Sequence, residues 1–331
     1  MISRTILATA AAISVLAATP SLAADNEAPL GGLITFHAET VYPESVTWSA
    51  KQQRFFVSSV REGTVGTVSR DGHYTPFISD NRLVSTVGLR VDDARNTLWV
   101  TNSDPGAGQR TNAATQGKLA GLARYDATTG KLGAYYDLGK LSEGSHFAND
   151  VAVDARGNAY VTDSFAPVIY KIDTSGKASI FAENPLFKSG EGFNLNGIAY
   201  LPDGSPGFIK SAGYLLVGKY NSGEIFKVGI DDPSKVTKVE LSEPLKGIDG
   251  FNLIDNAHLV AVVNLGADKA VELASTDHWK TATISREKKS IKSMPTAAAQ
   301  VGSNVWVLNA RLDTLFDPNA AKVSDYLLQK F

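Results

Sequence analysis

The 331-residue chain has no cysteine and only five histidines. The missing cysteines exclude disulfide bonds, thiolate zinc sites and cysteine nucleophiles. No two histidines stand four residues apart, so the paired spacing of many transition-metal sites is also missing. Without disulfides, the chain must be held together by a large apolar core or by a bound ion.

A strong charge of either sign is missing as well, since the formal net charge is -2. Binding to phosphate backbones needs clustered lysine and arginine, and the short run Arg286–Lys289 is typical of a solvated turn. We therefore expect no nucleic-acid partner. The sequence also lacks the nucleophile elbow Gly-x-Ser-x-Gly, a phosphate loop, a His-Glu-x-x-His pair and a dinucleotide fingerprint.

Apolar runs long enough to cross a bilayer are absent too. The longest, Ile6–Ala18, is shorter than the roughly 20 residues needed for a spanning helix. Arg4 precedes this run and small residues up to Ala23 follow it, which is the order of a secretory signal peptide. The sequence predicts a signal peptide over 1–23 and one domain over 24–331. We expect a secreted protein, periplasmic or extracellular, with no membrane contact after cleavage.

What the chain does have is a repeated strand pattern. Runs rich in Val, Ile, Tyr, Phe and Trp are broken by Gly, Asp, Asn and Pro, without long helical periodicity. Second strands are centred on six positions: Phe56, Trp99, Tyr160, Leu216, Val260 and Trp306. Units of about 45 residues match propeller blades. We predict an all-β, six-bladed β-propeller, closed by a strand at Ile34–Phe36 that pairs with the last blade. A pair of β-sandwiches is the alternative, but it does not explain the sixfold repeat.

Polar residues recur just before the first strand of most units. Four of these positions carry oxygen donors, and the other two carry Val87 and Thr296; the four are Glu44, Asn149, Asn196 and Asp249. Equivalent positions in a cyclic repeat converge on its axis. Two carboxylates and two amide oxygens would meet there, as Ca²⁺ requires. The pattern predicts a central site for Ca²⁺ or another divalent cation.

Several of these features have plainer interpretations. Asn196 and Asp249 each precede glycine and could be ordinary turn residues, and Glu44 could be a solvated loop carboxylate. The segment Ser103–Lys118 carries no strand signal and interrupts the second unit. Such a long loop is either a lid or binding loop, or a flexible excursion. Asp163 at the end of a strand could line the channel or serve a turn.

Four motifs carry a family resemblance when they are taken in order. They are Pro43–Trp48, Asn149–Asp154 continued by Gly157–Thr162, Asn196–Ala199 and Asp249–Gly250. Together they resemble the blade motifs of the senescence-marker-protein/gluconolactonase family of six-bladed propellers. Its superfamily includes diisopropylfluorophosphatase and, more distantly, the paraoxonases. The resemblance implies that Glu44, Asn149, Asn196 and Asp249 bind the metal. Where lactonases of this family often carry Arg, this chain has Phe147, preceded by His146.

The resemblance implies a Ca²⁺-dependent hydrolase of lactones or related esters. The metal would polarise the carbonyl, and Asp249 would act as general base or nucleophile. Asn149 and His146 are the candidate substrate contacts. We expect a small-molecule substrate and a monomer. Two alternatives stay open: a non-catalytic propeller that binds a ligand or protein around a structural ion, and a strictosidine-synthase-like enzyme, a class in which metal ligands are often missing.

Overall fold

A computed structural model describes residues 31–331, except 191 and 204–211. The expected signal peptide, residues 1–23, and its cleavage point lie outside the described residues. In the described part, no helix is long and apolar enough to span a membrane. The only α-helix there is α1 (Leu312–Phe316), and the single-turn 3₁₀ helices are η1 (Leu138–Leu141) and η2 (Pro185–Phe187).

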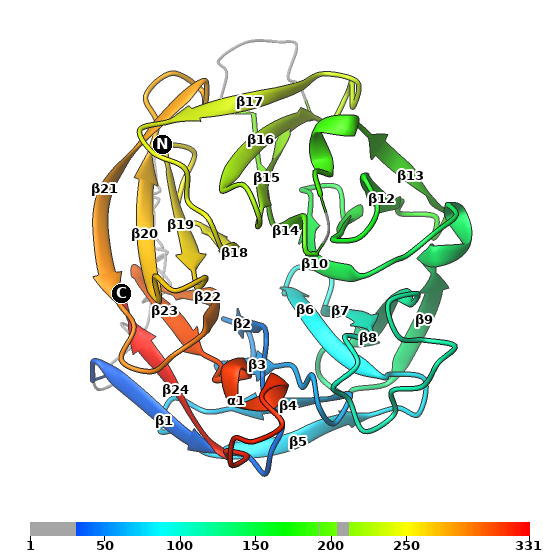
Figure 1. The fold of residues 1–331 in the computed structure, drawn as a ribbon, viewed down its shortest axis with the longest axis vertical. Helices are drawn as coiled ribbons and strands as arrows, with labels where there is room; N and C mark the ends of the chain where they lie inside the picture. The colour runs from blue at the N-terminus through cyan, green and yellow to red at the C-terminus, as the bar shows by residue number, and fades with distance from the viewer. Residues whose placement is uncertain (1–30, 191, 204–211) are drawn as a thin grey trace, which may run out of the picture. The chain divides into compact units, whose positions relative to one another are not determined.

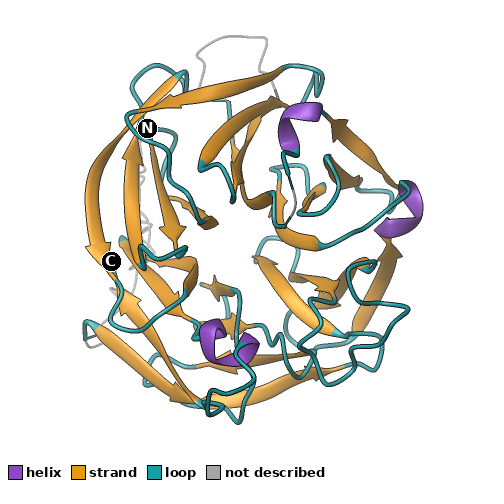
Figure 2. Cartoon of the chain, viewed as in Figure 1, coloured by secondary structure: helices purple, strands orange, loops and turns teal. Residues whose placement is uncertain are grey.

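Antiparallel four-stranded sheets account for nearly all the regular structure of these residues (Figure 2). Three of them use consecutive strands. The first contains β2 (Val46–Ser49), β3 (Arg54–Val57), β4 (Thr64–Val68) and β5 (Tyr74–Ser79). The second contains β6 (Ser85–Asp92), β7 (Thr97–Ser103), β8 (Ala120–Asp126) and β9 (Leu132–Asp137). The third contains β10 (Ala148–Val153), β11 (Ala159–Asp163), β12 (Val168–Ile172) and β13 (Ala178–Glu183).

The next eight strands form one larger sheet with two antiparallel halves. One half contains β14 (Leu195–Leu201), β15 (Tyr214–Lys219), β16 (Glu224–Gly229) and β17 (Val236–Leu241). The other contains β18 (Ile248–Leu253), β19 (His258–Val263), β20 (Lys269–Ala274) and β21 (Thr281–Lys289). Only the short parallel pairing of β17 with β21 joins the two halves.

The last sheet brings the two ends of the described chain together. It contains β22 (Pro295–Val301), β23 (Asn304–Asn309), β24 (Asp325–Lys330) and, at its edge, β1 (Leu33–His37). β1 pairs with β24 from Leu33 opposite Gln329 to His37 opposite Asp325. Side chains of β1 alternate between exposed and buried, as expected for an edge strand on a core. The predicted closure at Ile34–Phe36 is confirmed.

The first strands of the sheets surround a central space (Figure 1). These inner strands are β2, β6, β10, β14, β18 and β22, and each contacts the next, with β22 contacting β2. The predicted second strands around Phe56, Trp99, Tyr160, Leu216, Val260 and Trp306 are β3, β7, β11, β15, β19 and β23. The all-β prediction is confirmed, and the arrangement is consistent with a propeller.

The inner strands approach one another closely at the predicted polar positions. A Cβ atom on Gly197 would collide with the Asp249 carbonyl oxygen, and one on Gly250 would lie 2.6 Å from the Thr296 carbonyl oxygen. Glycine is therefore required after Asn196 and Asp249 because a neighbouring backbone occupies the side-chain space. The dipeptides that begin with Asn149, Asn196 and Asp249 also lie where the pairing register shifts, so each is an irregularity of the strand.

Hydroxyl groups tie the irregularities at Asn149 and Asn196, and the backbone at Glu44, to the neighbouring sheets. Thr101 of β7 donates to the Asn149 carbonyl oxygen at 2.7 Å, and Thr162 of β11 donates to the Asn196 carbonyl oxygen at 2.7 Å. Thr296 of β22 donates to the Glu44 carbonyl oxygen. These bonds satisfy carbonyl groups that the shifted ladder leaves free. They fix the backbone that carries the polar side chains.

Apolar side chains fill the space between neighbouring sheets. Between the sheet of β10–β13 and the half-sheet of β14–β17, a fully buried group includes Tyr160, Phe187 and Phe226. Burial of one such side chain contributes about 1.5–3 kcal/mol relative to exposure. This packing between neighbouring sheets holds the inner strands, and the side chains they carry, in fixed positions.

The closure by β1 gives the first testable prediction. Phe36 is buried and packs its ring against Tyr326 and Tyr74, at centroid distances of 5.6 and 6.4 Å. Phe36→Ala should lower the free energy of unfolding by about 3–5 kcal/mol because it leaves a cavity. Thr35→Ala, on the exposed face of the same strand, should change it by no more than about 0.5 kcal/mol. Urea titration measures both, and equal small effects would contradict a closing role for β1.

Candidate functional site

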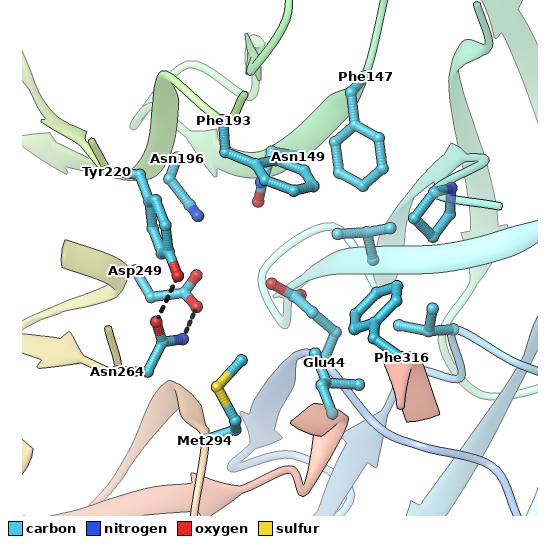
Figure 3. A pocket seen from close by; sticks show the side chains of 14 residues that line it. Glu44, Phe147, Asn149, Phe193, Asn196, Tyr220, Asp249, Asn264, Met294 and Phe316 are labelled. Carbon is cyan, nitrogen blue, oxygen red and sulfur yellow. Dashed lines mark hydrogen bonds between the residues drawn. The ribbon is translucent and has the colours of Figure 1, made fainter. Parts of the chain in front are cut away.

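The four predicted polar residues meet in one cavity. Glu44 lies two residues before β2, and Asn149, Asn196 and Asp249 are each the second residue of their inner strands. All four line a cavity of about 90 Å³ at the centre of the ring, named here the central cavity. Figure 3 shows the Glu44 and Asp249 carboxylates pointing toward each other across it. We call these four residues the oxygen tetrad.

Three oxygens of the tetrad are buried without a hydrogen-bond partner. They are the Oδ1 atoms of Asn149, Asn196 and Asp249. Buried polar atoms in proteins are nearly always hydrogen-bonded, so three orphans in one cavity need a physical explanation. The orientation of the Asn149 side-chain amide is set by its nitrogen, because Nδ2 donates to Ser164 Oγ at 3.0 Å. The free oxygen is therefore held ready for a ligand.

The two carboxylates destabilise each other's charged forms. Burial raises the pKa of Glu44 well above its usual value, and the charges of Asp249 and Asp150 raise it further. Burial raises the pKa of Asp249 to about 8, although a hydrogen bond from Asn264 works in the opposite direction. Both groups can be ionised together only if positive charge enters the cavity. The electrostatics thus favour a proton or a cation at this place.

The donor set fits a hard divalent cation. In the part of the chain that the structure describes, no three His, Cys, Asp or Glu side chains gather in a metal-binding cluster. The central cavity instead combines two carboxylates with two amides, and oxygen ligands of both kinds suit Ca²⁺. The two remaining ring positions add no ligand, since Val87 is apolar and the Thr296 hydroxyl is engaged with the Glu44 carbonyl.

A hydrogen-bonded chain orients Asp249. Tyr220 donates its hydroxyl to Asn264 Oδ1 at 2.8 Å, and Asn264 donates Nδ2 to Asp249 Oδ2 (dashed lines in Figure 3). One oxygen of Asp249 is thereby fixed, and the other stays free. Sequence reasoning missed Tyr220 and Asn264, although both line the cavity.

A repeated position marks these residues once the strand register is known. The residue before each strand member of the tetrad pairs with a residue at the end of the second strand, as Leu195 pairs with Lys219 and Ile248 with Val263. Tyr220 and Asn264 come directly after those partners, and so does Ser164, which follows the partner of Ala148. At this repeated position, Ser164 and Asn264 bind tetrad residues directly, and Tyr220 binds Asn264.

The structure does not bring His146 into the central cavity. Its ring is buried, with Nδ1 2.9 Å from Asp163 Oδ2 and Nε2 3.0 Å from the Ser142 carbonyl oxygen. The hydrogen bond with Asp163 is the main cause that raises the pKa of His146. Because both ring nitrogens have partners in the protein, we do not propose a substrate contact for His146. Asp163 is likewise engaged, accepting from the backbone N–H groups of Phe147, Phe165 and Ala166.

The loop Ser103–Lys118 forms part of the cavity wall. It folds around the buried Asp104, whose carboxylate accepts from the hydroxyls of Thr111 and Thr115, both at 2.6 Å. Pro105, directly after Asp104, lines the central cavity. The loop therefore contributes a fixed wall residue through Pro105.

Solved structures share this architecture. No protein-family model and no curated protein sequence matches the chain. The major allergen Mala s 1 of Malassezia sympodialis matches over 91% of this chain and 96% of its own, with a TM-score of 0.71 and 19% identity. Regucalcin from Agrobacterium tumefaciens, described as calcium-binding, matches over 88% and 90%, with a TM-score of 0.60 and 15% identity. A putative gluconolactonase matches over 90% and 92%, with a TM-score of 0.59 and 14% identity. At these identities the likeness establishes a common propeller fold.

The raised pKa of Asp249 gives the second prediction. A group whose pKa is about 8 when folded and 3.8 when unfolded stabilises the fold below pH 3.8. That contribution is lost as the pH rises toward 8. With EDTA present, the free energy of unfolding of the wild type should therefore fall, relative to that of Asp249→Asn, as the pH rises from about 4 to 8. Thermal unfolding at a series of pH values measures the difference, and parallel profiles for the two proteins would contradict the proposed electrostatics.

Proposed function

We propose that this protein is a divalent-cation-dependent hydrolase of lactones or related esters. The observation that carries the proposal is the set of orphaned buried oxygens of Asn149, Asn196 and Asp249 beside Glu44. In the proposed architecture, the eight-stranded sheet counts as two blades, giving a six-bladed propeller with the cation on its axis. Two structural neighbours, described as a calcium-binding protein and a putative gluconolactonase, agree with this proposal.

The cation would be held by Glu44, Asn149, Asn196 and Asp249. Ca²⁺ takes six to eight oxygen ligands, so four side chains leave positions for water and substrate. When bound, such a cation supplies Lewis-acid polarisation of a carbonyl oxygen. The carboxylates neutralise its charge, and the amides add ligands without adding negative charge. Asn149 would contact the substrate as well as the cation.

Asp249 is the proposed catalytic residue. Its Oδ2 accepts from Asn264, which keeps the carboxylate in one orientation, while Oδ1 is unpaired and faces the cavity. The free oxygen can take a proton from a water molecule that attacks the carbonyl carbon, whose ester C–O bond then breaks as the alcohol oxygen takes up a proton. Alternatively, it can attack that carbon itself, expelling the alcohol oxygen, and water would then hydrolyse the acyl group from Asp249. Tyr220 acts through Asn264 and is a positioning residue. Gly250 lets the neighbouring inner strand approach closely beside Asp249.

The wider setting is also part of the proposal. We assign residues 1–23 as a signal peptide that directs the protein out of the cytoplasm. The mature chain would act as a monomer on a small molecule. Western blotting of periplasmic and medium fractions, and light scattering of the mature protein, test these two assignments independently of the chemistry.

Replacement of Asp249 gives the third prediction. Asp249→Asn keeps the size of the side chain but removes the base and one carboxylate, so lactone hydrolysis should fall by at least about 100-fold. Circular dichroism should show an unchanged fold. EDTA should abolish wild-type turnover, and added Ca²⁺ should restore it. The measurement is kcat/KM over a panel of small lactones and esters.

Asp150→Asn is the control for this experiment. Asp150 neighbours Asn149, but its carboxylate accepts from the backbone N–H groups of Val151 and Ile198 and does not line the cavity. This variant removes a charge that raises the pKa of Glu44 and Asp249 but takes away neither a proposed ligand nor the base, so it should retain cation-dependent turnover. Near-normal turnover in Asp249→Asn would contradict the catalytic assignment. No turnover in the wild type, together with a melting temperature raised by Ca²⁺, would favour a structural ion in a ligand-binding propeller.

A further inference from the structure

The wall of the central cavity above the tetrad is apolar. Eight of the residues that line it carry no charged or hydrogen-bonding side chain: Val60, Val87, Pro105, Phe147, Phe193, Met294, Leu312 and Phe316. They come from several different sheets and loops, so the apolar character surrounds the cavity. A ligand whose reacting group reaches the tetrad must therefore place its remaining atoms against hydrocarbon.

One side of this wall is a continuous aromatic surface. Phe147 and Phe193 pack edge to face with ring centroids 5.1 Å apart, and Phe165 lies 5.4 Å and 5.2 Å from them. Phe193 in turn packs against Tyr220, 6.2 Å away. Rings that hold one another in this way form a preorganised apolar surface, which loses little conformational entropy when a ligand binds. Phe147 and Phe193 face the cavity in Figure 3.

The polar groups that remain are already engaged. Apart from the tetrad, the polar side chains that line the cavity within the described residues are Tyr220 and Asn264. The Tyr220 hydroxyl and Asn264 Oδ1 bind each other, and Asn264 Nδ2 donates to Asp249. Among the described residues, no side chain on this wall is wholly free to receive the hydroxyl groups of a sugar ring. Each hydroxyl buried there without a partner would lower affinity by about tenfold.

We propose that the preferred substrates are lactones or esters carrying an alkyl or aryl group, and that polyhydroxylated sugar lactones are poor substrates. This inference rests on the proposed hydrolase function and defines its substrate class. The ester group would lie at the tetrad, with the apolar substituent against Phe147, Phe193 and Phe316.

Phe316 marks where the substituent leaves the cavity. It is the last residue of α1 and lines the cavity, yet it is 49% exposed. The cavity therefore reaches solvent at this side chain. The volume of about 90 Å³ is of the same order as the roughly 150 Å³ cavity that holds benzene. A small lactone ring suits the interior, and a longer chain would extend outward across the Phe316 ring.

A homologous series of substrates tests the proposal. We would measure kcat/KM for γ-lactones with side chains of increasing length and for glucono-δ-lactone, with Ca²⁺ present. Each added methylene should raise kcat/KM by about threefold to fourfold until the chain passes Phe316. Glucono-δ-lactone should be the poorest substrate. A preference for glucono-δ-lactone would overturn the proposal while leaving the hydrolase function intact.

Phe316→Asn tests the wall directly. The residue is half exposed, so its replacement should not disturb folding. The variant should lose most of the dependence of kcat/KM on chain length. Ile291→Asn is the matched control, because Ile291 is also an exposed large apolar residue, at 59%, but does not line the cavity. An unchanged chain-length dependence in Phe316→Asn would contradict the proposed path.

A binding experiment separates this inference from the hydrolase proposal. Cyclopentanones with the same alkyl chains have no ester bond to hydrolyse, and calorimetry can follow their binding with EDTA present. Tighter binding with longer chains, with a negative heat-capacity change, would support the apolar substrate class even if no lactone were hydrolysed. Binding that does not depend on chain length would overturn the inference, whatever the outcome of the activity assay.

Discussion

Two carboxylates that face each other across the ring, Asp249 buried and Glu44 half-buried, are the constraint on which this site depends. Removal from water raises the pKa of both groups, and the charge of Asp249 raises the pKa of Glu44 further. A protein core tolerates such a pair only with a proton or a cation between the two groups. The unpaired amide oxygens of Asn149 and Asn196 favour a cation over a proton, because a proton shared by the carboxylates would leave both amide oxygens without a partner. Removing either carboxylate would therefore change the electrostatics of the whole cavity.

The ring of inner strands brings the four residues of the oxygen tetrad together. Side chains far apart in the sequence meet because each lies at the start of an inner strand and the strands contact one another in order. The glycines at 197 and 250 permit the close approach, and the hydroxyls of Thr101, Thr162 and Thr296 hold the irregular backbone. Closure of the last sheet by β1 joins the two ends of the ring. The closure of the outer strands therefore helps to hold the tetrad side chains in position.

Much of this could be predicted from the sequence because it repeats. Strand alternation and the spacing of second strands predicted the sheets, and Ile34–Phe36 predicted the closure. The tetrad was predictable because its members share one position within the repeat. Tyr220 and Asn264 were missed because their role depends on the cross-strand register, which a single sequence does not display. His146 is adjacent to the site in sequence, but its ring turns toward Asp163 and Ser142. Side-chain direction of this kind depends on tertiary contacts.

The central claim is that one divalent cation binds to the oxygen tetrad. Calorimetric titration of Ca²⁺ into metal-stripped protein tests it most directly, with Asn196→Leu and Asn252→Leu as a matched pair. Both asparagines are buried on inner strands, but only Asn196 lines the central cavity. We predict one ion per chain for the wild type and for Asn252→Leu, and no comparable binding for Asn196→Leu. Absence of binding in the wild type, or equal binding in both variants, would contradict the account.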